Sequence, residues 1–402
     1  MERVEKKNTD RERAAILIVA YKEPRRFQRL LDSVSGACYD EDRVDLIISI
    51  DKSDRMDVVR LAEAFVWEHG DKIIRTFPER QGLRRHILSC GDYLDEYDAL
   101  FILEDDLIVS PQFYRYGREC IKKYCNEDRV AGISLYSPQW NQNANLPFAA
   151  QKGRYDVYFL QCAQSWGQIW LKKQWKEFKD WYRENGDFFE KGEKESIPHH
   201  FYTWGENSWL KYHAAYCIES EKYFVCPYYS YTSTFMEVGE HTEKQITRYH
   251  SCLMVEEQDE WRFPETLEDG IIYDAFFENR TITERLARDL GKDVCLDLYG
   301  MKKDYEGSSL LLSTRLLPYK ILEEYGLQLR PPELNPLFRI EGKGIFLYDL
   351  KCGTGEQKKK EGEQICRIWN YHMRDRFLMA NEILPVAGEK FLNLLKILSR
   401  SK

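Results

Sequence analysis

Short apolar runs alternate with segments of helical periodicity over the first 110 residues. Residues 14–20 form a continuous apolar run of strand length, and the next segment, KEPRRFQRLLDSV, spaces its apolar residues like one face of a helix. The alternation continues with the strand-like runs RVDLIISID, DKIIRTFP and LFILEDD and the helix-like segments DVVRLAEAFVWEHG and RRHILSCGDYL. This pattern predicts an α/β fold with a mostly parallel, buried central sheet.

Polar residues follow each of the four predicted strands. Residues 21–23 follow the first strand, 51–53 the second, the segment ERQGLRR the third, and 104–106 the fourth. In open sheets of this kind, ligands bind outside the carboxyl ends of the strands. We therefore expect the four polar clusters to meet at one ligand-binding edge.

The fourth cluster consists of three consecutive carboxylates, Glu104, Asp105 and Asp106, placed directly after the apolar residues 99–103. Clustered like charges repel one another, and a bound cation relieves that repulsion. Mg²⁺ and Mn²⁺ prefer oxygen ligands and commonly bridge one or two carboxylates and the phosphates of a substrate. The cluster favours nucleotide-diphosphate chemistry, although Glu-Asp-Asp also occurs on ordinary solvated loops.

The remainder of the chain changes in character twice. Residues 130–260 are rich in Trp and Tyr, which suits either core packing or a platform for sugar rings. From about residue 270, shorter apolar runs with Pro-rich connections predict a smaller mixed unit. The last segment, GEKFLNLLKILSRSK, has one apolar face surrounded by basic residues, as in a helix at a membrane surface or a terminal helix packed on its own domain.

Composition narrows the functional classes. With 402 residues, the chain has room for one large domain or two moderate ones, and a net charge of -8 argues against a broad nucleic-acid-binding surface. Eleven cysteines without a C-x-x-C pair or zinc-ligand spacing indicate reduced thiols. The N-terminal residues lack the apolar core of a signal peptide, and no stretch reaches the roughly 18 apolar residues of a membrane span. We expect a cytoplasmic protein, with peripheral membrane contact through the C-terminal helix.

The stretch LFILEDDLIVSPQFY resembles the D-x-D region of the GT-A glycosyltransferases. Within that superfamily, the sequence is similar to the inverting N-acetylglucosaminyltransferases of the N-glycan and O-mannose pathways and to bacterial family 2-like transferases that build surface polysaccharides. The segments SWGQIWLKKQW and TWGENSWLKYHAAYCIES parallel that family's Trp/Gly-rich and acidic-Trp segments. The resemblance covers about residues 14–245, and its most specific part is the D-x-D context.

The resemblance implies a GT-A (Rossmann-like) fold and a domain division. Residues 1–13 would be a polar tail, and residues 14–265 a glycosyltransferase domain. Within that domain, residues 14–110 would form the nucleotide-binding half and residues 111–265 the acceptor half. Residues 266–402 would form a C-terminal accessory region that ends in the amphipathic helix.

Metal-site roles also follow from the resemblance. Asp106 would be the direct ligand of Mn²⁺ or Mg²⁺, and Glu104 and Asp105 would reach the ribose or a metal-bound water. His241, in VGEHTEK, would coordinate the metal or close over the diphosphate.

The resemblance further assigns residues that bind the donor. Asp51, at the end of the second predicted strand, would contact the nucleobase. Arg25 or Arg26 in the first loop, and Arg84 or Arg85 in RQGLRR, would meet the ribose-diphosphate side, where a planar guanidinium binds phosphate bidentately.

An inverting transfer needs a general base for the acceptor hydroxyl. Glu206, in TWGENSW, falls where the family places its catalytic acid residue, and we expect it at the start of a helix, whose dipole stabilises its charge. The family usually has Asp-Asp or Glu-Asp at this place, whereas this chain has Glu206 followed by Asn207. If the second position carries the base, another group must serve, and Glu237 and Glu240 are the reserves.

The implied function is metal-dependent transfer of a sugar from a nucleotide-diphospho-sugar, with uridine favoured, to a hydroxyl of a glycan or lipid-linked saccharide, with inversion. A sugar-phosphate nucleotidyltransferase would also use acidic metal ligands, but it normally has a Gly-rich loop after the first strand, and AYKEPRRF contains no glycine. A degenerate fold acting as a glycan-binding or scaffolding subunit is the non-enzymatic alternative, suggested by Asn207.

Overall fold

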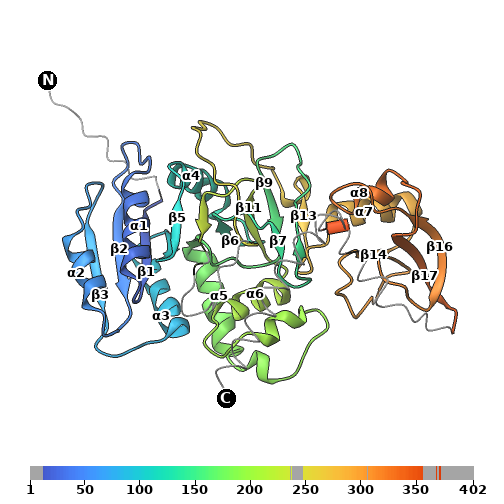
Figure 1. Cartoon of the computed structure of the whole chain (residues 1–402), viewed down its shortest axis with the longest axis horizontal. Coiled ribbons are helices and arrows are strands. Elements are labelled where there is room, and N and C mark those ends of the chain that lie inside the picture. Colours follow the sequence, from blue (N-terminus) through green and yellow to red (C-terminus); the bar gives the residue numbers. More distant parts are fainter. Residues whose placement is uncertain are drawn as a thin grey trace, which may run out of the picture.

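The computed structural model describes residues 12–235, 237, 248–305, 307–355, 368 and 371–372. Figure 1 shows a large α/β body with a smaller, C-terminal unit at one end of the long axis, opposite the first strands of the chain. None of the helices in the described ranges combines the length and the apolar character needed to cross a membrane. The predicted C-terminal amphipathic helix lies outside the described residues.

The N-terminal part alternates strands and helices as predicted. Its elements, in chain order, are β1 (Ala14–Ala20), α1 (Pro24–Ser35), β2 (Asp45–Ile50), α2 (Met56–Ala64), β3 (Lys72–Thr76), α3 (Leu83–Cys90), the 3-10 helix η1 (Gly91–Asp95) and β4 (Ala99–Glu104). Both β1 and β2 are buried along their whole length. Because their successive apolar side chains point to opposite faces, the strands contribute to one hydrophobic core on each side of the sheet.

The second predicted helix is shorter than its apolar spacing indicates. The pattern extends to Gly70, but α2 ends at Ala64 and Phe65 is already extended, with a ψ of 131°. Phe65 packs against the core, and Trp67 is buried with its indole N–H donating to the Val44 carbonyl at 2.7 Å. Packing of these rings at the sheet edge replaces the last helical turns.

The central sheet has nine strands in the order β13-β9-β11-β6-β10-β4-β1-β2-β3. Five of its eight neighbouring pairs are parallel and three are antiparallel, so the prediction of a mostly parallel α/β sheet is confirmed. The strands after β4 are β6 (Val130–Ser134), β9 (Val157–Leu160), β10 (Gln168–Leu171), β11 (Tyr223–Pro227) and β13 (Ile272–Tyr273). Two small ladders lie beside it: β5 (Leu107–Val109) with β12 (Thr232–Thr234), and β7 (Trp140–Asn141) with β8 (Leu146–Pro147).

Helices pack onto this sheet along the rest of the body. They are α4 (Phe113–Tyr124), α5 (Lys172–Glu184) and α6 (Leu210–Glu219), with the 3-10 turns η2 (Phe188–Glu190), η3 (His199–Thr203) and η4 (Leu267–Asp269). Most aromatic residues of the middle region are core residues here. Trp170 and Trp175 stack with ring centroids 3.7 Å apart, and Trp209 meets Trp170 edge-on. The ten cysteines of the described residues are all unbridged.

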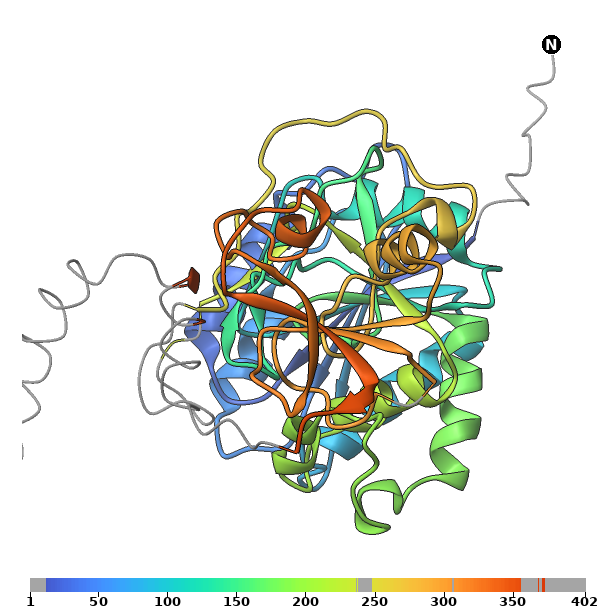
Figure 2. The ribbon, with the colours of Figure 1, turned by 90° about the vertical axis from the view of Figure 1, so that its right-hand side faces the viewer.

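The C-terminal unit has its own small mixed sheet in the order β14-β15-β17-β16 (Figure 2). Its elements are α7 (Arg280–Leu290), β14 (Val294–Asp297), β15 (Leu310–Ser313), β16 (Tyr319–Tyr325), α8 (Leu334–Leu337) and β17 (Ile345–Gly353). Two small hydrophobic clusters of its own pack against this sheet. The predicted boundary at residue 265 falls before β13, which pairs with β9, so the central sheet extends to Tyr273.

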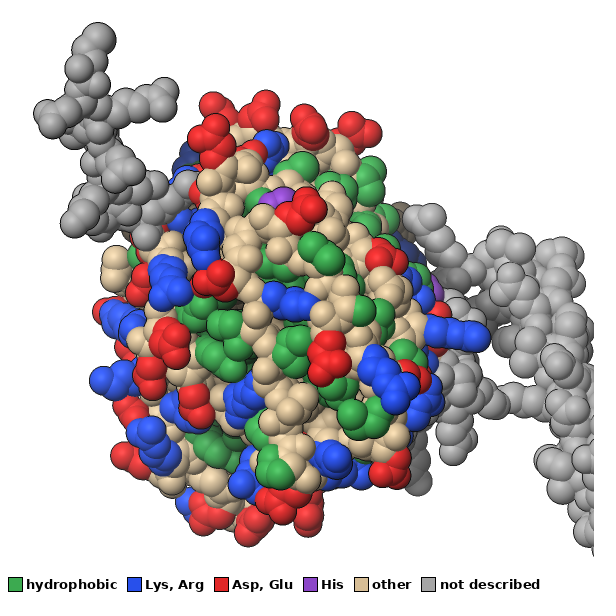
Figure 3. Space-filling view, turned by 90° about the vertical axis from the view of Figure 1, so that its left-hand side faces the viewer, with side chains coloured by type: hydrophobic (Ala, Val, Ile, Leu, Met, Phe, Trp, Pro, Cys, Tyr) green, Lys and Arg blue, Asp and Glu red, His purple; other side chains and the backbone are tan. Residues whose placement is uncertain are grey.

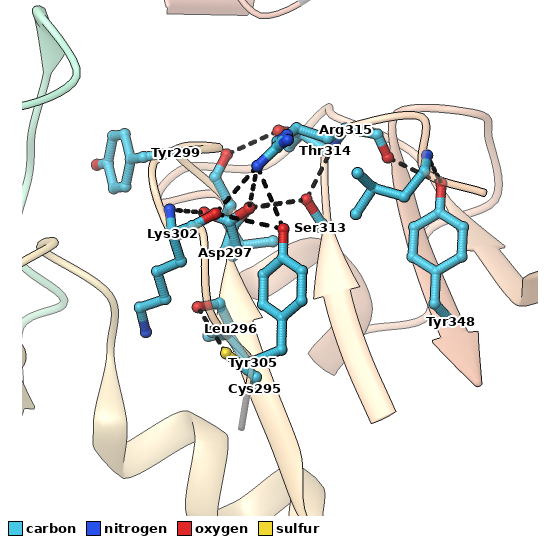
Figure 4. A network of polar contacts seen from close by, with 12 residues as sticks. Cys295, Leu296, Asp297, Tyr299, Lys302, Tyr305, Ser313, Thr314, Arg315 and Tyr348 are labelled. Carbon is cyan, nitrogen blue, oxygen red and sulfur yellow. Dashed lines mark hydrogen bonds and ion pairs between the residues drawn. The ribbon is translucent and has the colours of Figure 1, made fainter. Parts of the chain in front are cut away.

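A buried polar network holds the ends of β14 and β15 together (Figure 4). The carboxylate of Asp297, which is fully buried, accepts the backbone N–H of Lys302 at 2.9 Å and the Ser313 hydroxyl at 3.2 Å. Arg315 lies 3.8 Å from the same carboxylate and donates to the Lys302 carbonyl at 3.0 Å. These contacts explain why polar residues lie inside an otherwise apolar unit.

Basic and acidic side chains are interspersed at the surface. Lys and Arg alternate with Asp and Glu over the face at the β3 end of the molecule (Figure 3). On this face, side chains of the two charge signs are intermixed (Figure 3).

Candidate functional site

A cleft of about 670 Å³ opens at the carboxyl ends of β1, β2 and β4. Each of the four polar clusters that follow the first four strands contributes to its lining. The predicted ligand-binding edge therefore exists as a single cleft. It follows from the parallel order β4-β1-β2-β3, which brings four strand ends to one side.

The three acidic residues form the turn between β4 and β5. Glu104 is the last residue of β4, Asp105 and Asp106 make the turn, and β5 then pairs with β12. The Asp105 carboxylate accepts the backbone N–H of Tyr21 at 2.9 Å, and the Asp105 N–H donates to the Val19 carbonyl at 3.1 Å. The turn is thus fastened to the end of β1, and its side chains face the cleft half-buried.

Crowding of these carboxylates makes their ionised forms costly. Burial, and then the neighbouring charges of Asp106 and Asp105, raise the pKa of Glu104 to about 8, although a hydrogen bond with Ser165 opposes the shift. Burial, together with the neighbouring charge of Asp106, raises the pKa of Asp105 to about 7. The hydrogen bond that Asp105 accepts from the Tyr21 N–H opposes this shift. A cation at this turn would relieve the repulsion.

The carboxylate oxygens fit a hard divalent cation by chemical type. Among the described residues, however, no three His, Cys, Asp or Glu side chains are grouped to hold a metal ion by themselves. A cation here would need further oxygen ligands from phosphate or water, which is the usual arrangement for Mg²⁺ in phosphate-binding sites. His241, the other predicted ligand, lies outside the described residues.

Asp51 organises the floor of the cleft. Its carboxylate accepts the backbone N–H groups of Lys52 at 2.8 Å, Gln81 at 2.7 Å and Gly82 at 2.9 Å. Gly82 has a φ of 74°, which allows its N–H to point at the carboxylate just before α3 begins. Since a carboxylate has about four acceptor positions, one remains for a ligand. Contact with a nucleobase stays a prediction.

Cationic side chains reach the cleft from the start of α1 and from the loop after β3. Arg26 and Arg80 line it, whereas Arg25 is exposed and lies outside the lining. Arg84 packs against Tyr212 instead, with its guanidinium 3.2 Å from the Tyr212 hydroxyl. Of the predicted alternatives, Arg26 and not Arg25 lines the cleft, whereas neither Arg84 nor Arg85 does, and Arg80 lines it in their place. The signal for Arg80 was its position in ERQGLRR, directly after the third strand.

Glu206 occupies a turn rather than a helix start. The Ser208 N–H donates to the Gly205 carbonyl at 3.1 Å, so Glu206 and Asn207 form the tip of that turn, and α6 begins only at Leu210. The expectation that a helix dipole stabilises Glu206 is wrong, because three residues separate Glu206 from the first residue of the helix. Glu206 is exposed, and Asn207 beside it lines the cleft.

Of the two reserve candidates for the general base, Glu237 and Glu240, the structure describes only Glu237. Glu237 lines the cleft and pairs with Arg26 at 3.2 Å and Arg29 at 3.1 Å. The hydrogen bond from Arg29, with the charges of both arginines, lowers the pKa of Glu237 and makes it a weaker base. Glu240 lies outside the described residues.

Two aromatic groups at the cleft were not singled out from the sequence. His86, on α3, is buried at the cleft with Nε2 lying 2.7 Å from the Ser49 hydroxyl, and burial lowers its pKa to about 4. Trp166 also lines the cleft, unlike Trp170 and Trp175, which are buried. At helical spacing, an aromatic side chain such as that of His86 is expected to pack in the core. The sequence alone therefore did not identify His86 as a residue of the cleft.

Comparison with known proteins gives a distant likeness only. No protein-family model and no curated protein matches the chain. Among solved structures, residues 1–349 of TarS from S. aureus align with a TM-score of 0.36 and 9% identity, covering 55% of this chain and 59% of that one. The same protein in complex with UDP-GlcNAc has a TM-score of 0.36, 9% identity and coverages of 57% and 60%.

A mannosyltransferase from Pyrobaculum calidifontis, PcManGT, in complex with GDP-Man and Mn²⁺, aligns with a TM-score of 0.35 and 13% identity, covering 58% of this chain and 60% of that chain. The chain thus spans about 60% of the length of these structures. At such scores the likeness carries no conclusion about function.

Proposed function

We propose that this protein is a metal-dependent glycosyltransferase of the GT-A type. It would move a hexosyl or N-acetylhexosaminyl group from a nucleotide-diphospho-sugar to a hydroxyl of a glycan or lipid-linked saccharide, in the synthesis of a surface polysaccharide or glycoconjugate. The observation that carries the proposal is the cleft, in which three consecutive carboxylates face Lys22, Arg26 and Arg80 at the ends of parallel strands. Its volume of about 670 Å³ is in the range of small-molecule sites.

The residues divide the tasks of such a transfer. Asp106, with Glu104 and Asp105 beside it, would hold Mn²⁺ or Mg²⁺, which neutralises charge developing on the departing diphosphate. Guanidinium groups bind phosphate oxygens bidentately, a role for Arg26 and Arg80.

Glu206 is our candidate for the general base. The acceptor oxygen forms a bond to the anomeric carbon as the bond from that carbon to the diphosphate oxygen breaks, which inverts the configuration. Glu206 takes the acceptor proton, and the diphosphate leaves with the bonding electrons. Its exposed position beside Asn207, at the edge of the cleft, suits an acceptor that enters from solvent.

The first experiment is a nucleotide-diphosphate release assay with a panel of nucleotide sugars. It is run with Mn²⁺, with Mg²⁺ and with chelator, on the native protein, Asp106→Asn and the exposed-loop control Asp54→Asn. We expect metal-dependent release from one donor, reduced about 100-fold or more in Asp106→Asn, since a bound cation contributes several kcal/mol of transition-state stabilisation. Asp54→Asn should retain the native rate.

Calorimetry of Mn²⁺ and UDP binding provides a readout that does not depend on turnover. Donor binding without release, even with saccharide acceptors present, would indicate a glycan-binding or scaffolding subunit. Release of pyrophosphate from a nucleoside triphosphate and a sugar phosphate would identify a nucleotidyltransferase. Neither binding nor release with any donor would contradict the transferase proposal.

A further inference from the structure

Two arginines on α1 hold a single carboxylate at the edge of the cleft. Arg26 and Arg29 are three residues apart in the helix and therefore lie on the same face. The Nε of Arg26 is 3.2 Å from Oε2 of Glu237, and Nη1 and Nη2 of Arg29 are 3.1 Å from Oε1 and 3.3 Å from Oε2. We call Arg26 and Arg29 the arginine pair.

The arginine pair is held in place by packing as well as by charge. The guanidinium of Arg29 lies 3.3 Å from the centre of the Phe235 ring, a cation–π contact. The Arg26 and Arg29 side chains are only 15% and 28% exposed, whereas the Glu237 side chain is 39% exposed. The cationic groups are thus fixed, and the anion that they bind is the more accessible partner.

This geometry suits an oxyanion in general, not a carboxylate alone. Guanidinium groups bind carboxylate and phosphate with the same two-pronged hydrogen bonding, and phosphate carries more charge. Arg26 and Glu237 both line the cleft that contains the acidic turn. The carboxylate of Glu237 therefore occupies a place that a phosphate group of a ligand in the same cleft could take.

We propose that the arginine pair is an anion subsite of the cleft and that Glu237 competes with the diphosphate of the donor for it. Binding of the donor replaces the Glu237 carboxylate on the arginine pair with phosphate oxygens. The inference rests on the proposed function for the identity of the ligand, but the anion subsite itself can be tested with inorganic pyrophosphate.

The test measures the dissociation constants of Mn²⁺-pyrophosphate and Mn²⁺-UDP by calorimetry for the full-length protein and Glu237→Gln. Removing the competing charge should tighten pyrophosphate binding about threefold to fivefold, the upper part of the range expected for partly exposed ion pairs. Glutamine keeps the size of the side chain, and the partly exposed position of Glu237 should leave folding intact, which circular dichroism verifies.

Glu23→Gln is the matched control. Glu23 lines the same cleft and loses the same charge, but it forms no ion pair with Arg26 or Arg29 among the described residues. Its effect on pyrophosphate affinity should be less than twofold. If both variants bound pyrophosphate equally more tightly, the gain in affinity would come from the overall charge of the cleft. This result would overturn the proposal.

Arg29→Gln tests the contribution of the arginine pair itself. In the Glu237→Gln background, it should remove most of the affinity gained, because the subsite loses one of its two guanidinium groups. Unchanged or weaker pyrophosphate binding in Glu237→Gln would show that Glu237 positions the arginines instead of competing, and would overturn the proposal. So would an absence of pyrophosphate binding in all variants.

The outcomes separate this inference from the proposed function. Tighter pyrophosphate binding in Glu237→Gln, in a protein that neither binds nor cleaves nucleotide sugars, would support the anion subsite and contradict the transferase. Robust diphosphate release with no change of affinity in Glu237→Gln would support the transferase and contradict the competition.

Discussion

At the scale of single residues, several ionisable groups are placed where their charged forms are disfavoured. His213 on α6 is the plainest case, because it is fully buried and neither ring nitrogen has a hydrogen-bond partner among the residues that the structure describes. Its ring lies 4.3 Å from that of Phe178 and 5.3 Å from that of Phe224, measured between centroids. Burial alone lowers the pKa of His213 to about 3.

This residue makes a prediction about acid stability. Between pH 6.5 and 3 the unfolded chain binds a proton at His213 and the folded chain does not, so stability falls as the pH decreases through this range. His213→Leu should reduce the slope of unfolding free energy against pH by up to about 1.4 kcal/mol per pH unit. Urea denaturation between pH 4 and 7.5 measures the slope.

A neighbouring substitution that does not titrate serves as the comparison. Phe178→Leu should lower the free energy of unfolding, and the size of this loss should not depend on pH. If His213→Leu leaves the pH dependence of the native protein unchanged, the imidazole is not held neutral by burial.

At the scale of elements, the position of the acidic turn depends on how α4 packs against β4. Gly117, in the middle of α4, lies against Phe101 of β4, and a Cβ added there would be 2.2 Å from the ring. The helix therefore approaches the strand that ends in Glu104 more closely than any larger residue allows. Glycine usually destabilises the interior of a helix, but at position 117 the close packing of α4 against β4 requires it.

Gly117→Ala tests this requirement. In an open helical position, alanine stabilises by about 1 kcal/mol relative to glycine. Here we expect a net loss of about 1–3 kcal/mol in the free energy of unfolding, because the methyl group displaces the buried Phe101 ring. Chemical denaturation measures the change, and Gly205→Ala, where the added Cβ meets nothing within 4 Å, should be nearly neutral. A gain of stability in Gly117→Ala would contradict the packing argument.

At the scale of the whole molecule, buried hydrogen bonds join the C-terminal unit to the central sheet. Glu333, which precedes α8 and is 4% exposed, accepts from Nδ2 of Asn279 at 3.1 Å and from the Tyr273 hydroxyl at 3.3 Å. Tyr273 belongs to β13, so the link runs directly from the small unit into the sheet. Burial raises the pKa of Glu333 despite these donors.

Glu333→Ala should therefore destabilise the molecule by about 1–3 kcal/mol, because the buried Tyr273 hydroxyl and the Asn279 amide each lose a hydrogen bond to its carboxylate. Glu333→Gln keeps one acceptor oxygen and carries no charge to desolvate, so its effect should be clearly smaller. Thermal unfolding of both variants measures the difference. Equal losses would indicate that the charge, and not the hydrogen bonds, stabilises the contact.

The alternation of strands and helices, the burial of β1 and β2, and the polar strand ends follow from the sequence alone. They could be predicted because hydrophobic periodicity and the polar residues after each strand are local properties of the chain. The parallel order of the first four strands then requires their polar ends to meet in one cleft. Glu104 to Asp106 could thus be identified as candidate ligands before any contact was known.

Only the tertiary structure determined which side chains reach the cleft and where two of the predicted helices begin or end. It brought Arg26 and not Arg25 to the cleft, and Arg80 in place of the predicted Arg84 or Arg85, because helix rotation and loop path determine which guanidinium faces the cleft. It ended α2 early and moved Glu206 from a helix start to a turn tip, since ring packing and backbone hydrogen bonds overrode periodicity. It also brought Glu237 to α1, a contact between residues 208 apart in the chain that only the folded molecule creates.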